Sequence, residues 1–124
     1  MAKKKGKTIM IVDDEPDNVE TVQMLLESKG YNIITARNGD ECLELLKTMK
    51  KKPNLVLMDI MMPGTPVKEI IPKMKGTKVA YLSVVRMSEA EKEDLMASKN
   101  IVGFIQKPFE INDLVEQIKK FVGA

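Results

Sequence analysis

Short apolar runs alternate with helical repeats along most of the chain, and this alternation limits the possible fold more than any other feature. The runs have four to six residues, and most are rich in β-branched side chains, as is typical of buried strands. Between them, apolar residues recur at intervals of three and four, the period of a helix that packs on one face. The predicted strands cover residues 8–12, 31–36, 55–58, 79–82 and 102–105, and the helical repeats cover 16–29, 42–49, 67–74, 89–98 and 111–122.

Five β-α units in this order predict the α/β class, with a parallel five-stranded sheet and helices on both of its faces. Right-handed crossovers leave few topologies, and we expect the flavodoxin-like (βα)5 three-layer sandwich with strand order 2-1-3-4-5. A chain of 124 residues is the size of one domain. We therefore expect a single domain over residues 1–124, with a flexible basic tail at residues 1–7.

Several residues indicate where the helices begin and end. Pro16 suits the first turn of a helix, and Gly30 suits the position just after its last turn. Ser88 and Glu91 have the spacing of a capping box at the start of the fourth helix, whose apolar stripe is the weakest of the five. Pro72 falls inside the third helix, where it removes a backbone hydrogen bond. We expect that helix to be kinked, shortened or restarted.

Composition excludes several classes of function. The single cysteine, Cys42, rules out an intramolecular disulfide. The absence of histidine rules out catalysis by histidine and metal sites with histidine ligands. Cys42 lies on an apolar stripe and is expected to be buried and inert, and the ten methionines are expected to fill the core. A net charge of +2 does not indicate direct nucleic-acid binding. No apolar run approaches the roughly 18 residues of a membrane span, so we expect a cytoplasmic protein without membrane insertion.

Charged and polar residues follow four of the predicted strands, at the edge where open parallel sheets bind ligands. Asp13 and Asp14 follow the first strand, Asp59 follows the third, Ser83 ends the fourth, and Lys107 follows the fifth. Three neighbouring carboxylates repel one another and need compensating positive charge. Oxygen donors without a soft ligand favour Mg²⁺, and an aspartate beside the ion can act as a nucleophile toward phosphorus. The edge therefore has the residues needed for phosphoryl transfer.

This constellation resembles the receiver domain of two-component response regulators. The resemblance runs from Thr8 to Val122, and its most specific segments are 12–16 (VDDEP), 58–64 (MDIMMPG), 82–83 (LS) and 103–109 (GFIQKPF). It implies a phosphorylation switch that catalyses only its own phosphorylation and dephosphorylation, and so is not an enzyme acting on external substrates.

The resemblance also implies roles for the residues at the strand ends. Asp59 would accept the phosphoryl group from a histidine kinase. Asp14 and, partly through water, Asp13 would hold Mg²⁺ together with Asp59 and the backbone carbonyl of Met61. Lys107 would pair with the phosphoryl oxygens.

A second set of implied roles concerns the signal. Ser83 stands where the family has a hydroxyl that moves toward the phosphoryl group, and Phe104 stands where an aromatic ring turns inward with it. From the residue type alone, Phe104 fits an ordinary core position equally well. The switch would change the surface of the fourth helix, fifth strand and fifth helix for a downstream protein partner that the sequence does not identify. We expect a monomer or a weak phosphorylation-dependent dimer.

The sequence departs from the usual receiver pattern near the phosphorylation site. Val84 is bulkier than the small residue most common there, and it would narrow access to Asp59. Met61 and Val85 occupy positions that often carry polar groups able to hold an attacking water. Because two apolar side chains cannot hold that water, we expect slow loss of the phosphoryl group.

Three other interpretations are compatible with parts of the pattern. A phosphorylation-independent adaptor on the same fold would leave the acidic pocket idle. A flavin electron carrier would need a phosphate-binding loop rich in Ser, Thr and Gly after the first strand, which is absent from the sequence. An aspartyl phosphatase would need a further acid near Asp59, and Ile60 and Met61 do not supply one.

Overall fold

The computed structural model describes residues 7–60, 67–74, 76–83, 88–106 and 110–122. Met61, Val84, Val85, Lys107 and nearly all of the expected basic tail lie outside the described residues. The strands are β1 (Thr8–Val12), β2 (Asn32–Ala36), β3 (Leu55–Asp59), β4 (Val79–Ser83) and β5 (Ile101–Gln106). The helices are α1 (Pro16–Ser28), α2 (Gly39–Thr48), α3 (Val67–Ile70), α4 (Glu89–Leu95) and α5 (Ile111–Val122), with a 3-10 helix, η1 (Ile71–Met74), after α3.

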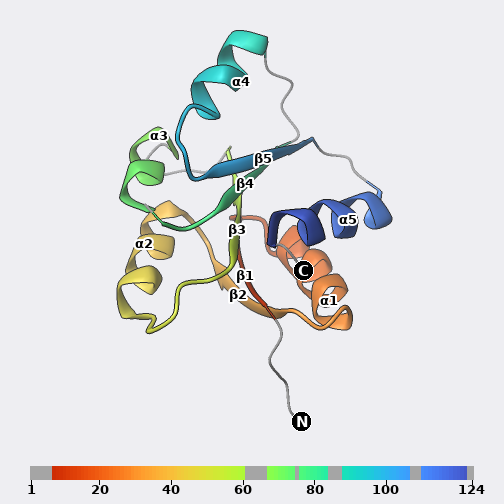
Figure 1. The fold of residues 1–124 in the computed structure, drawn as a ribbon. Coiled ribbons are helices and arrows are strands. Elements are labelled where there is room, and N and C mark those ends of the chain that lie inside the picture. The colour runs from red at the N-terminus through yellow and green to blue at the C-terminus, as the bar shows by residue number, and fades with distance from the viewer. Residues whose placement is uncertain (1–6, 61–66, 75, 84–87, 107–109, 123–124) are drawn as a thin grey trace.

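The five strands form one parallel sheet in the order β2-β1-β3-β4-β5, which confirms the predicted class and topology. Figure 1 shows α1 and α5 on one side of this sheet and α2 and α3 on the other. Every strand therefore ends at the same edge of the sheet. The end of β1 lies beside the end of β3, because Val12 pairs with Met58 in the register.

Each face of the sheet has its own hydrophobic core, since alternate residues of a strand point to opposite faces. Under α1 and α5, the core contains Ile9, Ile11, Leu55, Leu57, Leu26, Leu114 and Ile118. Under α2, α3 and η1, it contains Met10, Val56, Met58, Cys42, Leu46, Ile70 and Met74. The central strands are buried on both faces, which explains why their sequences are almost continuously apolar.

The residues predicted to mark helix ends are confirmed, but α4 ends at Leu95, three residues before the predicted end at Ser98. Pro16 opens α1, and Gly30 follows its last turn with a φ of 95°, a conformation that glycine adopts without steric cost. At α4, the Ser88 side chain accepts a hydrogen bond from the Glu91 backbone, and the Glu91 carboxylate accepts one from the Ser88 backbone. These two bonds form the expected capping box.

The third helix is interrupted at Pro72, as predicted. Only four residues of α3 are α-helical before the chain tightens into η1, which contains Pro72. The missing N–H of proline and its ring prevent the α-helical hydrogen-bond pattern from continuing. Ile71 and Met74 nevertheless stay buried in the core, so the interrupted segment still covers the sheet.

The described side chains of the fourth helix contribute little to the core. Among its described residues, Lys92 is half-buried and the others are exposed, and none of them belongs to either hydrophobic cluster. Figure 1 shows α4 projecting beyond the β5 edge of the sheet. The weak apolar pattern of this segment therefore corresponds to a helix that little burial anchors.

The prediction that all methionines fill the core is wrong for two of them. Met24 is 64% exposed and Met96 is 37% exposed. Met24 follows the buried Val22 by two positions, which places it about 200° around the helix from the face that packs on the sheet. Cys42, by contrast, is fully buried as expected.

A glycine in β5 lets α5 approach the sheet closely. A Cβ atom at Gly103 would overlap Cζ of the Phe121 ring. Gly103 pairs with Ala80 next to an irregularity in the register between β4 and β5. The small residue and the aromatic ring therefore fit together at this point.

Candidate functional site

Three carboxylates meet at the carboxyl end of the sheet. One oxygen each from Asp13, Asp14 and Asp59 forms a group in which all the atoms lie within 4.8 Å of one another. Asp13 is buried, Asp14 is exposed, and Asp59 at the end of β3 is half-buried. The group therefore opens to solvent on the Asp14 side, where a ligand can approach.

The backbone around this group is fixed by hydrogen bonds. The Asp13 N–H donates to the Ala36 carbonyl at 3.1 Å, which ties the end of β1 to the end of β2. The Glu15 N–H donates to Asp13 Oδ1 at 2.9 Å, so this carboxylate also stabilises the turn that leads into α1. The Asp13 carboxylate thus takes part both in the hydrogen bond of this turn and in the acidic group.

Asp59 is held by the neighbouring strand. It pairs with Leu82 of β4 in the register, and the N–H of the next residue, Ile60, donates to the Leu82 carbonyl at 3.4 Å. Pairing of β3 with both β1 and β4 therefore fixes the position of Asp59 relative to Asp13 and Asp14.

Of the other predicted site residues, Ser83 is described only in its backbone, and two are not described at all. Lys107 and Met61 lie outside the described residues. The backbone of Ser83 ends β4 and pairs with Gln106, whereas its side chain lies outside the described part. The sequence thus placed Asp13, Asp14 and Asp59 correctly at one edge, and it placed Ser83 at the end of the adjacent strand.

Phe104 lies between the sheet and α4. Its ring packs edge-on against Tyr81, with centroids 6.3 Å apart, and the Lys92 ammonium lies 5.4 Å from its centroid. Phe104 is half-buried, whereas Tyr81 is only 1% exposed. The ring therefore connects a buried residue of β4 to a charged residue of α4.

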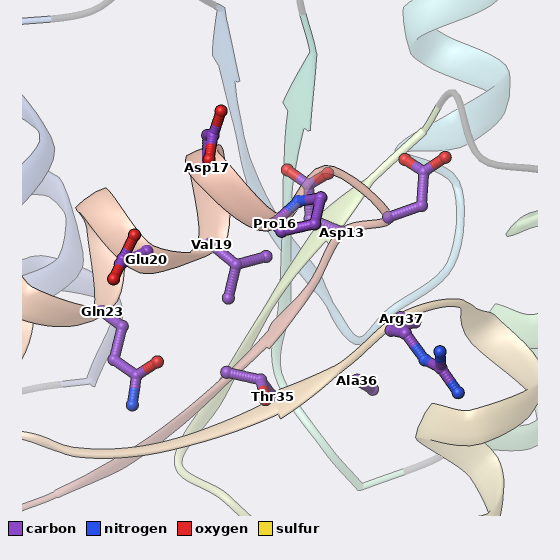
Figure 2. Close-up of a pocket in the computed structure, with 10 residues that line it drawn as sticks. Asp13, Pro16, Asp17, Val19, Glu20, Gln23, Thr35, Ala36 and Arg37 are labelled. Carbon is purple, nitrogen blue, oxygen red and sulfur yellow. The ribbon is translucent and has the colours of Figure 1, made fainter.

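A groove runs from the acidic group between α1 and the end of β2 (Figure 2). It measures about 460 Å³, and its walls include Asp13, Asp14, Gln23, Thr35 and Arg37. Arg37 also follows a strand directly, at the end of β2, and so lies at the same edge of the sheet as the predicted site residues.

Arg37, the residue directly after β2, brings a positive charge to the groove. Its side chain is 86% exposed, and its Nε lies 4.0 Å from Glu41 Oε1, so the ion pair is loose. The backbone N–H of Arg37 also donates to Glu41 Oε1 at 2.6 Å. The guanidinium is thus available to solvent at the rim of the groove.

The donor set of the acidic group fits a hard divalent cation. All three residues offer carboxylate oxygens, the ligands that Mg²⁺ prefers, and no soft ligand belongs to the group. Cys42, the only cysteine, lies in the core beneath α2. An arrangement of this kind can bind a cation and, next to it, a phosphoryl group.

Comparisons with known proteins agree with this geometry. A family model described as the response regulator receiver domain matches residues 9–119. The phosphate regulon transcriptional regulatory protein PhoB of Pseudomonas aeruginosa is 32% identical over 118 residues, which cover 92% of this chain and 51% of PhoB. The polar-differentiation response regulator DivK of Brucella anthropi is 29% identical over 121 residues, which cover 94% of this chain and 97% of DivK. The chain thus spans about half the length of PhoB and nearly all of DivK.

Solved structures give the same result. A CheY-like response regulator receiver domain protein from Methanospirillum hungatei superposes with a TM-score of 0.77 at 32% identity, covering 94% of each chain. The response regulator TrrA from Thermotoga maritima, solved in complex with Mg²⁺-BeF, superposes with a TM-score of 0.74 at 34% identity, covering 93% of this chain and 98% of TrrA.

No helix within the described ranges has the length and apolar character needed to span a membrane. The family match extends over nearly all of the described fold, and the three carboxylates lie at the end of the sheet where open α/β folds bind ligands. From the sequence match, the strand order and the acidic cluster together, we conclude that this chain belongs to the response regulator receiver domain family.

Proposed function

We propose that this receiver domain accepts a phosphoryl group on Asp59 from a histidine kinase and passes the signal through the surface formed by α4, β5 and α5. The observation that supports this most strongly is the meeting of Asp13, Asp14 and Asp59 within 4.8 Å in a chain of this family. Asp59 is the best candidate for the acceptor because it ends the central strand of the sheet.

Asp13, Asp14 and Asp59, together with the backbone carbonyl of Met61, would hold Mg²⁺. When bound, the cation neutralises negative charge on the carboxylates and on the phosphoryl oxygens. The burial of Asp13 and the half-buried position of Asp59 support this role, since charges interact more strongly where less water screens them.

The proposed reaction is a transfer between two residues. A carboxylate oxygen of Asp59 attacks the phosphorus of a phosphohistidine, the P–N bond breaks, and the imidazole leaves with the electron pair. Lys107 would pair with the negative oxygens of the phosphoryl group during the transfer. In this proposal the chain acts only on itself and turns over no external substrate.

The signal would leave the site through Ser83 and Phe104. The Ser83 hydroxyl would bond to the phosphoryl group, and the Phe104 ring would turn into the space that this movement vacates. The contacts of Phe104 with Tyr81 and Lys92 support such a route, because they link β4 and β5 to α4. The poorly anchored α4 would then move at low energetic cost and change the surface seen by a separate protein.

Intact-protein mass spectrometry tests the acceptor assignment. The protein is incubated with a small phosphoryl donor, with Mg²⁺ or with a chelator, and compared with the Asp59→Asn variant. We expect one added phosphoryl group only in the unmodified protein and only with Mg²⁺. The carboxamide of the variant is a poor nucleophile but nearly the same size, so its fold should remain.

Two results would count against this assignment. Phosphorylation of Asp59→Asn to the same extent would place the acceptor elsewhere. Failure of the unmodified protein with both a small donor and a phosphorylated histidine kinase would favour a phosphorylation-independent adaptor.

A further inference from the structure

The connections that lead from a helix into the next strand are basic and contain no acidic residue. Ahead of β2, β3, β4 and β5, the chain reads 29–31 (KGY), 49–54 (MKKKPN), 75–78 (KGTK) and 96–100 (MASKN), and Lys7 directly precedes β1. At least one lysine therefore lies ahead of every strand. We call the described lysines of these segments the basic rim: Lys7, Lys29, Lys50, Lys51, Lys52, Lys78 and Lys99.

Backbone hydrogen bonds hold these segments side by side at the amino ends of the strands. The Asn32 N–H donates to the Lys7 carbonyl at 2.9 Å, and the Val56 N–H donates to the Lys78 carbonyl at 2.9 Å. The Val79 N–H donates to the Asn100 carbonyl, next to Lys99, at 2.8 Å. With strands about 4.8 Å apart, the rim extends roughly 19 Å along the edge of the sheet.

The charges of the rim are available to a partner. All seven lysines are exposed. None of them forms an ion pair within 4.0 Å of a carboxylate among the residues that the structure describes. Lys52 and Lys78 donate hydrogen bonds to the carbonyls of Leu46 and Phe121 at the ends of α2 and α5. Lys50 and Lys51 make no such bond to any residue that the structure describes. Glu27, two positions before Lys29, accepts a hydrogen bond from Gln23 Nε2 at 3.3 Å.

Helix capping does not account for the whole rim. Lysines near helix C-termini complement the helix dipole, which explains Lys52 and Lys78. Lys7 precedes the first strand and follows no helix within the described residues. Lys50 and Lys51 lie beyond the end of α2, as Lys52 does, but unlike Lys52 they have no hydrogen bond to an α2 carbonyl in the part of the chain that the structure describes. A shared partner with negative charge explains their placement better than local helix stabilisation.

The chemistry of the rim favours a diffuse anionic surface over a structured partner. Its cations are all lysines, which act as point charges, whereas Arg37 follows β2 at the other end of the strands. Met96, 37% exposed, is the one large exposed apolar side chain in the described parts of these connections, so the aromatic and aliphatic anchors of a protein interface are missing there. The helices present their C-terminal ends here, so they offer no N-terminal amides to phosphates.

We propose that the basic rim docks the protein on the surface of a membrane that contains anionic lipids. The attraction is electrostatic and peripheral, because the rim adds charge without an apolar segment that would insert. The acidic group of Asp13, Asp14 and Asp59 lies at the opposite end of the strands. A docked molecule therefore keeps this end exposed to protein partners.

Sedimentation with lipid vesicles tests the proposal. The vesicles are phosphatidylcholine alone or phosphatidylcholine mixed with phosphatidylglycerol, at low and at high salt. We expect binding only to the mixed vesicles and only at low salt, since added ions screen surface charge. The variant Lys50→Gln/Lys51→Gln should bind at least about tenfold more weakly.

A control variant changes the net charge equally at the other end of the molecule. Ala90→Glu/Asn112→Asp also lowers the net charge by two, at exposed positions in the first turns of α4 and α5, where acids are tolerated. It should bind the mixed vesicles as the unmodified protein does, and thermal unfolding should show that both variants are folded.

Three outcomes would overturn the proposal. One is the absence of binding to mixed vesicles at low salt. Another is an equal loss in both variants, which would show that only net charge matters. The third is tighter binding of a DNA duplex than of the mixed vesicles at the same ionic strength, which would assign the rim to nucleic acid.

Discussion

Burial gives Cys42 and Tyr81 titration behaviour that their residue types do not have in water. Burial raises the pKa of the Cys42 thiol from 9.0 to about 11, and it raises the pKa of the Tyr81 hydroxyl from 10.0 to about 12. Both side chains belong to the core that packs beneath α2 and α3. At neutral pH both are therefore protonated, and Cys42 is a poor nucleophile, as the sequence predicted.

These shifts predict that the protein loses stability at alkaline pH. The folded protein retains protons that the unfolded chain releases, so this stabilisation is complete below pH 9 and is lost as the pH rises toward 12. The slope is on the order of 1 kcal/mol per pH unit for each group. Urea unfolding between pH 8 and 11 measures it. The Cys42→Ala variant should be less stable overall but show a shallower slope, and an unchanged slope would contradict the assignment.

The side chains of Met61 and Val85 predict a long-lived phosphorylated state. Val85 has no polar side-chain atom, and Met61 has only a thioether sulfur, which is a weak acceptor and no donor, so neither positions water well for attack on an aspartyl phosphate. We expect a half-life of minutes or longer in the presence of Mg²⁺, measured by the decay of the phosphorylated mass. The Met61→Gln variant, similar in size but polar, should shorten it. A half-life of seconds in the unmodified protein would be incompatible with this explanation.

At single positions, the sequence was most informative where chemistry and topology agreed. Asp13, Asp14 and Asp59 could be predicted as neighbours because parallel strands end at one edge and acids there require a ligand or a cation. Arg37 was missed because a lone arginine after a strand has no distinctive pattern. Met24 was misplaced because its residue type indicates the core although its position on the helix does not.

At the level of the helices and strands, periodicity predicted every strand and most boundaries to within one residue. The start of α2 at Gly39 and the end of α4 at Leu95 each differ from the prediction by three residues. Short apolar runs and helix-capping residues are local signals, and the corresponding strands and caps are present in the structure, as the capping box at Ser88 shows. The interruption of the third helix was also predictable from Pro72, and the exposure of α4 was predictable from its weak apolar stripe. The close approach of α5 to β5 could not be predicted from local signals, because it depends on a contact between Gly103 and Phe121, which are distant along the chain.

The contact between Gly103 and Phe121 predicts the effect of a single added methyl group. In Gly103→Ala, the new Cβ would overlap the Phe121 ring unless α5 or the ring moves. We expect the free energy of unfolding to fall by about 1–3 kcal/mol, as for other overpacked cores. Chemical denaturation measures this loss. In a Phe121→Leu background the same substitution should cost less, and additive costs would show that the two residues do not interact.

Across the whole molecule, the parallel fold separates two kinds of chemistry. Acids gather at the carboxyl ends of the strands, where the proposed phosphorylation takes place, and lysines gather at the amino ends. The net charge of +2 conceals this separation, because it averages over both ends. Sequence could reveal it only once the strand order was known, since the rim joins five segments that are distant along the chain.

The central claim is that occupation of the acidic site changes the surface around α4. Backbone amide NMR tests it most directly, with spectra of the protein alone, with Mg²⁺, and with Mg²⁺ plus beryllofluoride as a stable substitute for the phosphoryl group. Asp59→Asn is the control. We predict that Mg²⁺ shifts signals near Asp13, Asp14 and Asp59, and that beryllofluoride then shifts Ser83, Phe104 and α4 in the unmodified protein only. Mg²⁺ binding with no response of these residues to beryllofluoride would contradict the switch and favour an adaptor with an idle pocket.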